Sequence, residues 1–82
     1  MPRRKSPERR WESIEHLING EGDITIGRVG PIRCAATAAD RHNALAMLVR
    51  RPRESLEDLL TRLNEAIRAA IEDGAYTDEI NG

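Results

Sequence analysis

The sequence predicts an α+β fold: a small single domain with an N-terminal helix, a two- to three-stranded antiparallel sheet and a long C-terminal helix packed on one face. Three observations predict it. The 82-residue chain has the length of one domain, aliphatic residues recur at helical spacing near both ends, and β-branched residues alternate between them. A sheet this small cannot stand alone, so the helices must cover one of its faces.

The first helix is predicted over residues 7–19. Ser6 suits the N-cap, and Pro7 suits the first helical position. Trp11, Ile14 and Ile18 then form one apolar stripe, which is typical of an amphipathic helix. Gly20 can end the helix in the left-handed conformation.

Two or three strands are predicted between the helices. The residues Ile-Thr-Ile at 24–26 are β-branched at every position and predict a strand, and Gly30-Pro31 predicts a hairpin turn or a bend. Two further apolar runs of strand length, 32–39 and 44–49, are separated by the polar residues 40–43.

The alanine content of this region leaves a second interpretation open. Alanine favours helix, so residues 33–49 could form one helix interrupted by polar residues. We favour strands, because the polar tetrapeptide separates two runs of strand length. In that interpretation Leu45, Met47 and Val49 share one face of the last strand. The preceding strand has Ile32, Cys34, Ala36 and Ala38 on one face.

The long helix is predicted over residues 54–73. Ser55 and Asp58 are spaced like a capping box with Asp in place of Glu, and Gly74 closes the helix. Its apolar residues recur at spacings of three and four: Leu56, Leu59, Leu60, Leu63, Ala66, Ile67, Ala70 and Ile71.

The chain divides into a disordered basic arm at 1–5, a single α+β domain at 6–74 and an acidic C-terminal tail at 75–82. Its charge is uneven. Residues 1–10 hold five basic groups and one acidic group, net +4. Residues 54–82 hold two basic and eight acidic groups, net −6, within a total of −1.

A lone cysteine and the lack of long apolar runs predict a soluble, cytoplasmic protein. Cys34 is the only cysteine, so no internal disulfide is possible, and a lone thiol is typical of a reducing compartment. No apolar run approaches the roughly 18 residues of a membrane span. The charged N-terminal region does not resemble a signal peptide.

No recognisable catalytic machinery follows from the residue pattern. His16, Cys34 and His42 lack zinc-type spacing, and no phosphate-binding glycine motif is present. Cys34 lies in an apolar alternation, which is typical of a buried, inert thiol. Asp40 and His42 together are typical of a solvated turn. We therefore expect no enzyme activity, no cofactor and no metal.

The leading functional interpretation is a non-catalytic intracellular interaction module, with a homodimer and an unidentified protein partner. The apolar stripe of the long helix is broad for so small a core, and its small residues would let a second helix approach. The expected interface residues are Leu59, Leu63, Ala66 and Ala70.

The alternative is an accessory nucleic-acid-binding protein that uses its basic N-terminal arm. The arm's expected phosphate contacts are Arg3, Arg4, Lys5, Arg9 and Arg10, and a second basic patch comprises Arg50, Arg51 and Arg53. A strand leading into a helix resembles the ribbon-helix-helix repressors, but their second helix has no counterpart after Gly74. An isoelectric point near 6.1 also argues against this function.

Overall fold

The computed structural model describes residues 11–81, and the predicted basic arm with the beginning of the predicted first helix lies outside them. The α+β class is confirmed, with four strands in the sheet rather than two or three. The elements in chain order are α1 (Glu12–Asn19), β1 (Asp23–Val29), β2 (Ile32–Ala39), β3 (Ala44–Val49), α2 (Leu56–Asp73) and β4 (Thr77–Asp78).

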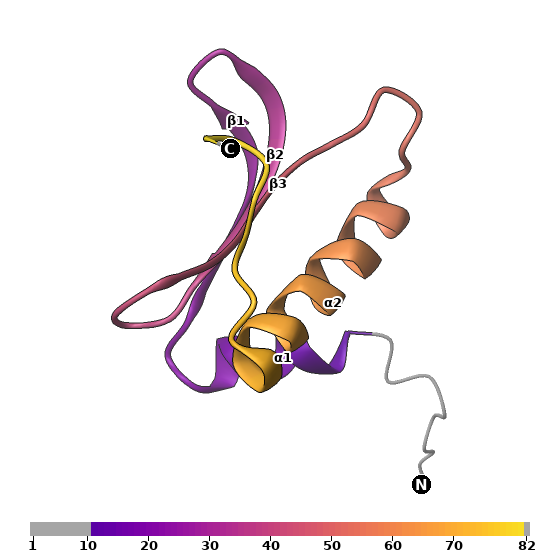
Figure 1. The fold of residues 1–82 in the computed structure, drawn as a ribbon. Coiled ribbons are helices and arrows are strands. Elements are labelled where there is room, and N and C mark those ends of the chain that lie inside the picture. The colour runs from indigo at the N-terminus through magenta and orange to yellow at the C-terminus, as the bar shows by residue number, and fades with distance from the viewer. Residues whose placement is uncertain (1–10, 82) are drawn as a thin grey trace, which may run out of the picture.

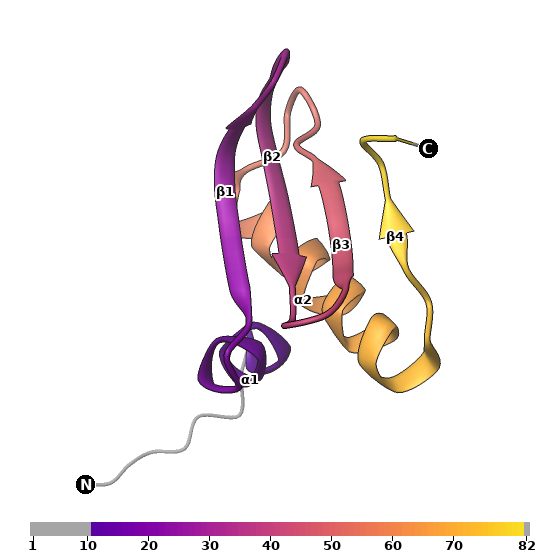
Figure 2. The same ribbon diagram turned by 90° about the vertical axis from the view of Figure 1, so that its left-hand side faces the viewer.

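The strands lie in the order β1-β2-β3-β4. The first three form antiparallel hairpins, whereas β4 runs parallel to β3. A parallel return needs a crossover, and α2 provides it. Residues 75–81, expected in an acidic tail, thus supply the fourth strand. Both helices lie on the same side of the sheet (Figure 1). Neither helix covers the opposite face, which Figure 2 shows.

The alanine-rich region forms strands, so the helical alternative for 33–49 is wrong. Ala36 lies opposite Leu48 and Ala38 opposite Ala46, and all four side chains belong to the core. Packing overrides the helical preference of alanine here, because small side chains on this face leave room for α2.

The face predicted for β3 needs correction. Ala46 and Leu48 face the helices, and Met47 and Val49 lie on the opposite face of the sheet because side chains alternate along a strand. Leu45 is also buried in the core, although it was expected to share a face with Met47 and Val49. The pairing skips this residue, so it occupies a β-bulge that changes the alternation.

The end of α1 differs from expectation in two ways. Leu17 is its buried residue, whereas Ile18 of the predicted stripe is 53% exposed. Gly20 has a φ of −103°, and Glu21, with a φ of 73°, takes the left-handed conformation instead. Gly22 N–H donates to the carbonyl of Leu17, and a Cβ at Gly22 would collide with the Leu17 side chain. The turn into β1 therefore requires glycine at position 22.

Both ends of α2 follow the predicted chemistry, although the helix begins at Leu56 rather than at residue 54. Ser55 Oγ accepts the Asp58 N–H at 3.0 Å, and Gly74 has a φ of 70°, as a left-handed cap requires. Between these ends the helix buries one stripe on the sheet, formed by Leu59, Leu63, Ala66 and Ile67.

Two isoleucines one turn apart on α2 test this packing. We expect Ile67→Val to lower the free energy of unfolding by about 1 kcal/mol, because Ile67 is completely buried. The same substitution at Ile71, which is 48% exposed, should change it by less than about 0.5 kcal/mol. Urea denaturation followed by circular dichroism measures both. Equal effects would contradict the orientation of α2.

Candidate interaction surface

Cys34 and His42 are not brought together by the fold. Cys34 lies near one end of β2 and His42 beyond the other, so at least five residues of strand, roughly 17 Å, separate them. The Asp40 carboxylate accepts the N–H groups of His42 and Asn43 at 2.8 and 2.7 Å. These bonds hold the pKa of Asp40 below its usual value. Asp40 therefore stabilises a turn, as the sequence suggested.

A groove of about 680 Å³ runs between α1 and α2. Arg68 lies in it and donates to Glu65 and Glu72 at 3.1 Å each. These bonds raise the pKa of Arg68 above its usual value. Within residues 11–81, no group of three or more His, Cys, Asp or Glu side chains could hold a metal ion. The remaining charged or imidazole side chains of the groove are Glu12, Glu15 and His16.

The first turn of α1 is capped by α2 rather than by its own sequence. Asn64 Oδ1 accepts the N–H groups of Ser13 and Ile14 at 2.9 and 3.0 Å. These N–H groups have no partner within the helix, because they lie in its first turn and no helical carbonyl precedes them. Trp11 occupies the N-cap position and makes no side-chain cap bond. Asn64 therefore fixes α1 against α2.

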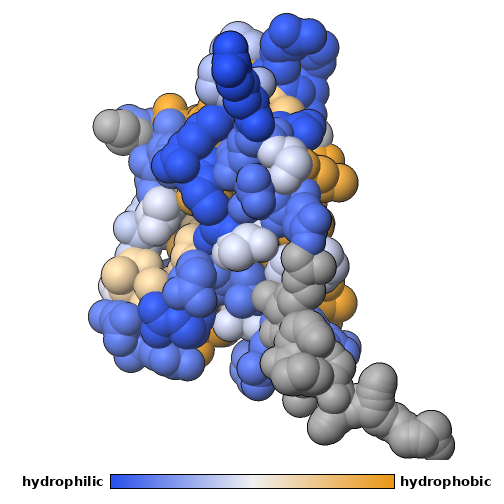
Figure 3. Space-filling model, turned by 90° about the vertical axis from the view of Figure 1, so that its right-hand side faces the viewer, coloured by the Kyte–Doolittle hydropathy of each residue, from blue (hydrophilic) through white to orange (hydrophobic). Residues whose placement is uncertain are grey.

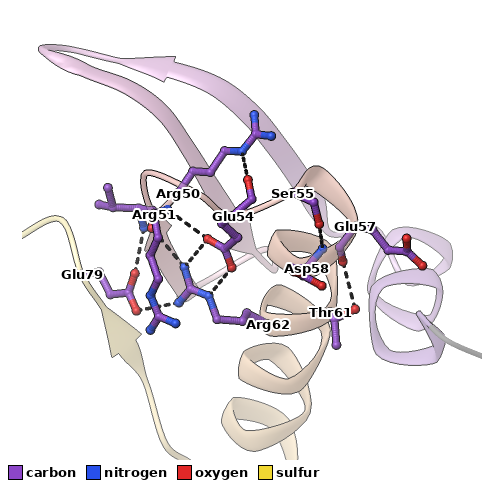
Figure 4. Close-up of polar contacts among 10 residues, drawn as sticks. Arg50, Arg51, Glu54, Ser55, Glu57, Asp58, Thr61, Arg62 and Glu79 are labelled. Atoms are coloured by element: carbon purple, nitrogen blue, oxygen red, sulfur yellow. Dashed lines mark hydrogen bonds and ion pairs between the residues drawn. The ribbon is translucent and has the colours of Figure 1, made fainter.

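Arg62 is the centre of the main polar cluster (Figure 4). Its guanidinium donates to both carboxylate oxygens of Glu54, at 2.7 and 3.0 Å, and to Glu79 at 2.9 Å. It also donates to the Val49 carbonyl at 3.0 Å, and the Glu79 carboxylate accepts the Val49 N–H at 2.9 Å. Arg62 thus joins α2 to the end of β3 and to the residue after β4.

Glu54 is held in this cluster as a carboxylate. Its side chain is only 6% exposed, and the hydrogen bond from Arg62 lowers its pKa to about 2. The same bond raises the pKa of Arg62. Sequence patterns did not reveal the cluster, because Glu54 is eight residues from Arg62, and Glu79 comes near only through the return of β4.

The predicted second basic patch is partly engaged in these contacts. Arg50 Nε donates to the Glu54 carbonyl at 2.9 Å, and the Arg51 N–H donates to the Glu54 carboxylate at 3.0 Å. All three arginines of the patch are exposed. The total charge is −1 and residues 1–10 carry +4, which leaves −5 for residues 11–82. The arm residues Arg3, Arg4, Lys5, Arg9 and Arg10 lie outside the described part of the chain.

The interface residues predicted on α2 pack against the sheet of their own chain. Leu59 and Leu63 are fully buried, Ala66 is 9% exposed, and Ala70 packs partly buried against the same core. A dimer through this stripe would require α2 to leave its sheet. The surface on the helical side is mostly hydrophilic, with hydrophobic side chains mainly toward its margins (Figure 3).

The outer face of the sheet is a further unpartnered surface of the described chain. No helix within residues 11–81 covers its outer face (Figure 2). Across this face the pairing aligns Thr25 with Thr37, Met47 and Asp78. The Tyr76 hydroxyl lies 3.1 Å from the Met47 sulfur. This face therefore combines small, polar and soft apolar side chains.

The two edges of the sheet differ. One is the two-residue β4, and the other is β1, whose seven residues pair only with β2 in the described chain. Lys, Pro and inward-pointing charges commonly protect such an edge. The Asp23–Val29 segment has no Lys or Pro, and its charged residues, Asp23 and Arg28, stand near its ends.

No protein-family model, curated protein or solved structure matches the chain. Among residues 11–81, neither helix is long and apolar enough to cross a lipid bilayer.

The ion pair of Glu54 with Arg62 predicts a specific loss of stability in acid. Its pKa is about 2 in the folded chain and near 4.5 when unperturbed. A lowered folded-state pKa stabilises the fold above the unfolded-state value, and this contribution is lost as pH falls from about 4.5 to 2. We expect a decrease in the free energy of unfolding of at most about 3 kcal/mol over that range.

Urea denaturation at pH 7, 5 and 3 tests this loss. Glu54→Gln should be less stable than the native chain at pH 7 and should show a smaller decrease toward pH 3. The control is Glu15→Gln, because Glu15 is exposed on α1, and it should retain the native pH dependence. An unchanged pH dependence in Glu54→Gln would rule out the assigned role of Glu54.

Proposed function

We propose that the protein is a non-catalytic interaction module that works as a homodimer in the cytoplasm. The observation that supports this best is the sheet, whose helices cover one face and whose first strand has a free edge in the described chain. Unpaired backbone groups along an edge, next to an uncovered face, can be completed by another protein chain.

The small core supports association of two chains. Eleven hydrophobic residues are buried within residues 11–81, and five of them are alanines, which bury little apolar surface. Small domains commonly compensate for a limited core by forming oligomers. A homodimer would therefore add stability that the small core of one chain does not provide.

The cytoplasmic location and the protein partner are parts of the same proposal. Cys34 is a free, half-buried thiol, as suits a reducing compartment. The uncovered outer face around Thr37 and Met47 remains available when chains associate through an edge. We assign that face to a protein partner rather than to a small substrate, because it is broad and open.

Nucleic-acid binding by the basic arm ranks second. The described part of the chain is acidic, and Arg50 and Arg62 are already bonded within it. Such binding would weaken steeply with salt. It would also be lost when the arm's basic residues become alanine, namely Arg3, Arg4, Lys5, Arg9 and Arg10.

Size-exclusion chromatography with light scattering tests the proposed function. We expect a species of twice the 9.2 kDa chain mass that dissociates on dilution and persists at high salt. Its absorbance ratio at 260 and 280 nm should be that of protein alone. A monomer at every concentration would contradict the homodimer, and a high ratio that salt removes would favour nucleic-acid binding.

A further inference from the structure

At two isoleucines of β1, the backbone N–H and C=O groups point away from β2, toward the free edge of the sheet. The Arg50 N–H donates to the Cys34 carbonyl. Cys34 and every second residue after it in β2 therefore direct their backbone N–H and C=O groups toward β3. In agreement, the Met47 carbonyl accepts the Glu79 N–H on the β4 side. The backbone groups of the next residue, Leu48, therefore point toward β2.

The same alternation continues into β1. Ala35 and Thr37 direct their N–H and C=O groups to their partners Gly27 and Thr25. The residues between and beside these partners, Ile24 and Ile26, therefore direct theirs away from β2, toward the free edge. This edge ends near Gly27, where the β1–β2 register shifts.

The geometry points to self-association of the protein through this edge, with β1 of one chain antiparallel to β1 of a second copy. A two-fold axis perpendicular to the sheet would pass between the two Thr25 residues. Ile24 of each chain would then form a hydrogen-bonded pair with Ile26 of the other. The two sheets would become one continuous sheet of eight strands, with all helices on the same side.

Side chains favour a second copy as the occupant. Ile24 and Ile26 lie on the helical side of the sheet, since their partners are the core residues Ala38 and Ala36. Ile26 is 39% exposed in the single chain and would be covered by Ile24 of the other copy. Cross-strand pairs of β-branched residues stabilise such ladders.

Charge selects the same register. With Thr25 on the axis, Asp23 of each chain lies opposite Gly27 of the other and Arg28 opposite Gly22, so neither charge faces a like charge or an isoleucine. A register shifted by one residue in each chain would place Arg28 opposite Ile24 and leave Ile26 paired with itself. The interface is narrow, so the dimer is expected to be weak and concentration-dependent.

A cysteine at the axis tests the register directly. In a non-hydrogen-bonded pair the two Cα atoms lie about 4.5 Å apart, within the range that a disulfide spans. We expect Thr25→Cys, in a Cys34→Ser background, to form a disulfide-linked dimer on mild oxidation. Thr37→Cys in the same background is the matched control, because it lies on the same face one strand away. It should remain largely monomeric on a non-reducing gel.

A charged substitution tests the edge without cross-linking. Ile26→Lys should weaken dimerisation at least tenfold by sedimentation analysis, with an unchanged circular dichroism spectrum. Ile71→Lys adds the same charge at a residue on α2 that is 48% exposed and should leave dimerisation unchanged.

This interface rests on the proposed homodimer, and the results separate the two. A native dimer that Ile26→Lys leaves intact, with no cross-link at position 25, would overturn the edge pairing and retain the dimer. A native monomer without the cross-link would overturn both, and it would leave the β1 edge to a strand of another protein.

Discussion

The close approach of α2 to the sheet is the contact on which the other features depend. Ala36, Ala38 and Ala46 present only methyl groups to this helix, and larger side chains would push it outward. The position of α2 sets the crossover to β4. It also brings Asn64 to the first turn of α1 and Arg62 to the ends of two strands.

An alanine-lined core limits how much apolar surface one chain can bury. Hydrophobic stabilisation scales with that area, so this core contributes less than one filled with larger side chains. Polar contacts between elements are correspondingly important here. The Arg62–Glu54 pair is shielded from water and bidentate, which gives it more weight than an exposed ion pair such as Arg41–Glu21. Dimerisation would bury additional apolar surface by covering the free edge.

Local signals made the long helix predictable. Its caps at Ser55 and Gly74 and its apolar stripe all lie within the helix or next to it, so they are readable in one stretch of sequence. The turn at Gly30-Pro31 is local in the same sense. Leu45 was wrongly predicted to share a face with Met47 and Val49, because the bulge at Leu45 changes the simple alternation.

The candidate surface could not be predicted, because it depends on which elements become neighbours. An amphipathic stripe shows that Leu59 and Leu63 need a cover, but their own sheet provides it. The free edge at β1 follows only from the strand order, which places this strand at one edge of the sheet. Neither the return of β4 nor the contact of Glu79 with Arg62 has a periodic signature, because β4 has only two residues.

The parallel return of β4 bears on the order of folding. The β1–β2 and β2–β3 hairpins join neighbouring segments, whereas residues 50–76 separate β3 from β4. Closing a longer loop costs more entropy, so we expect β4 to dock after the hairpins and α2 are in place. Contacts that form after the transition state govern the unfolding rate more than the folding rate. We therefore expect loss of the bond between Arg62 and Glu79 to speed unfolding more than it slows folding.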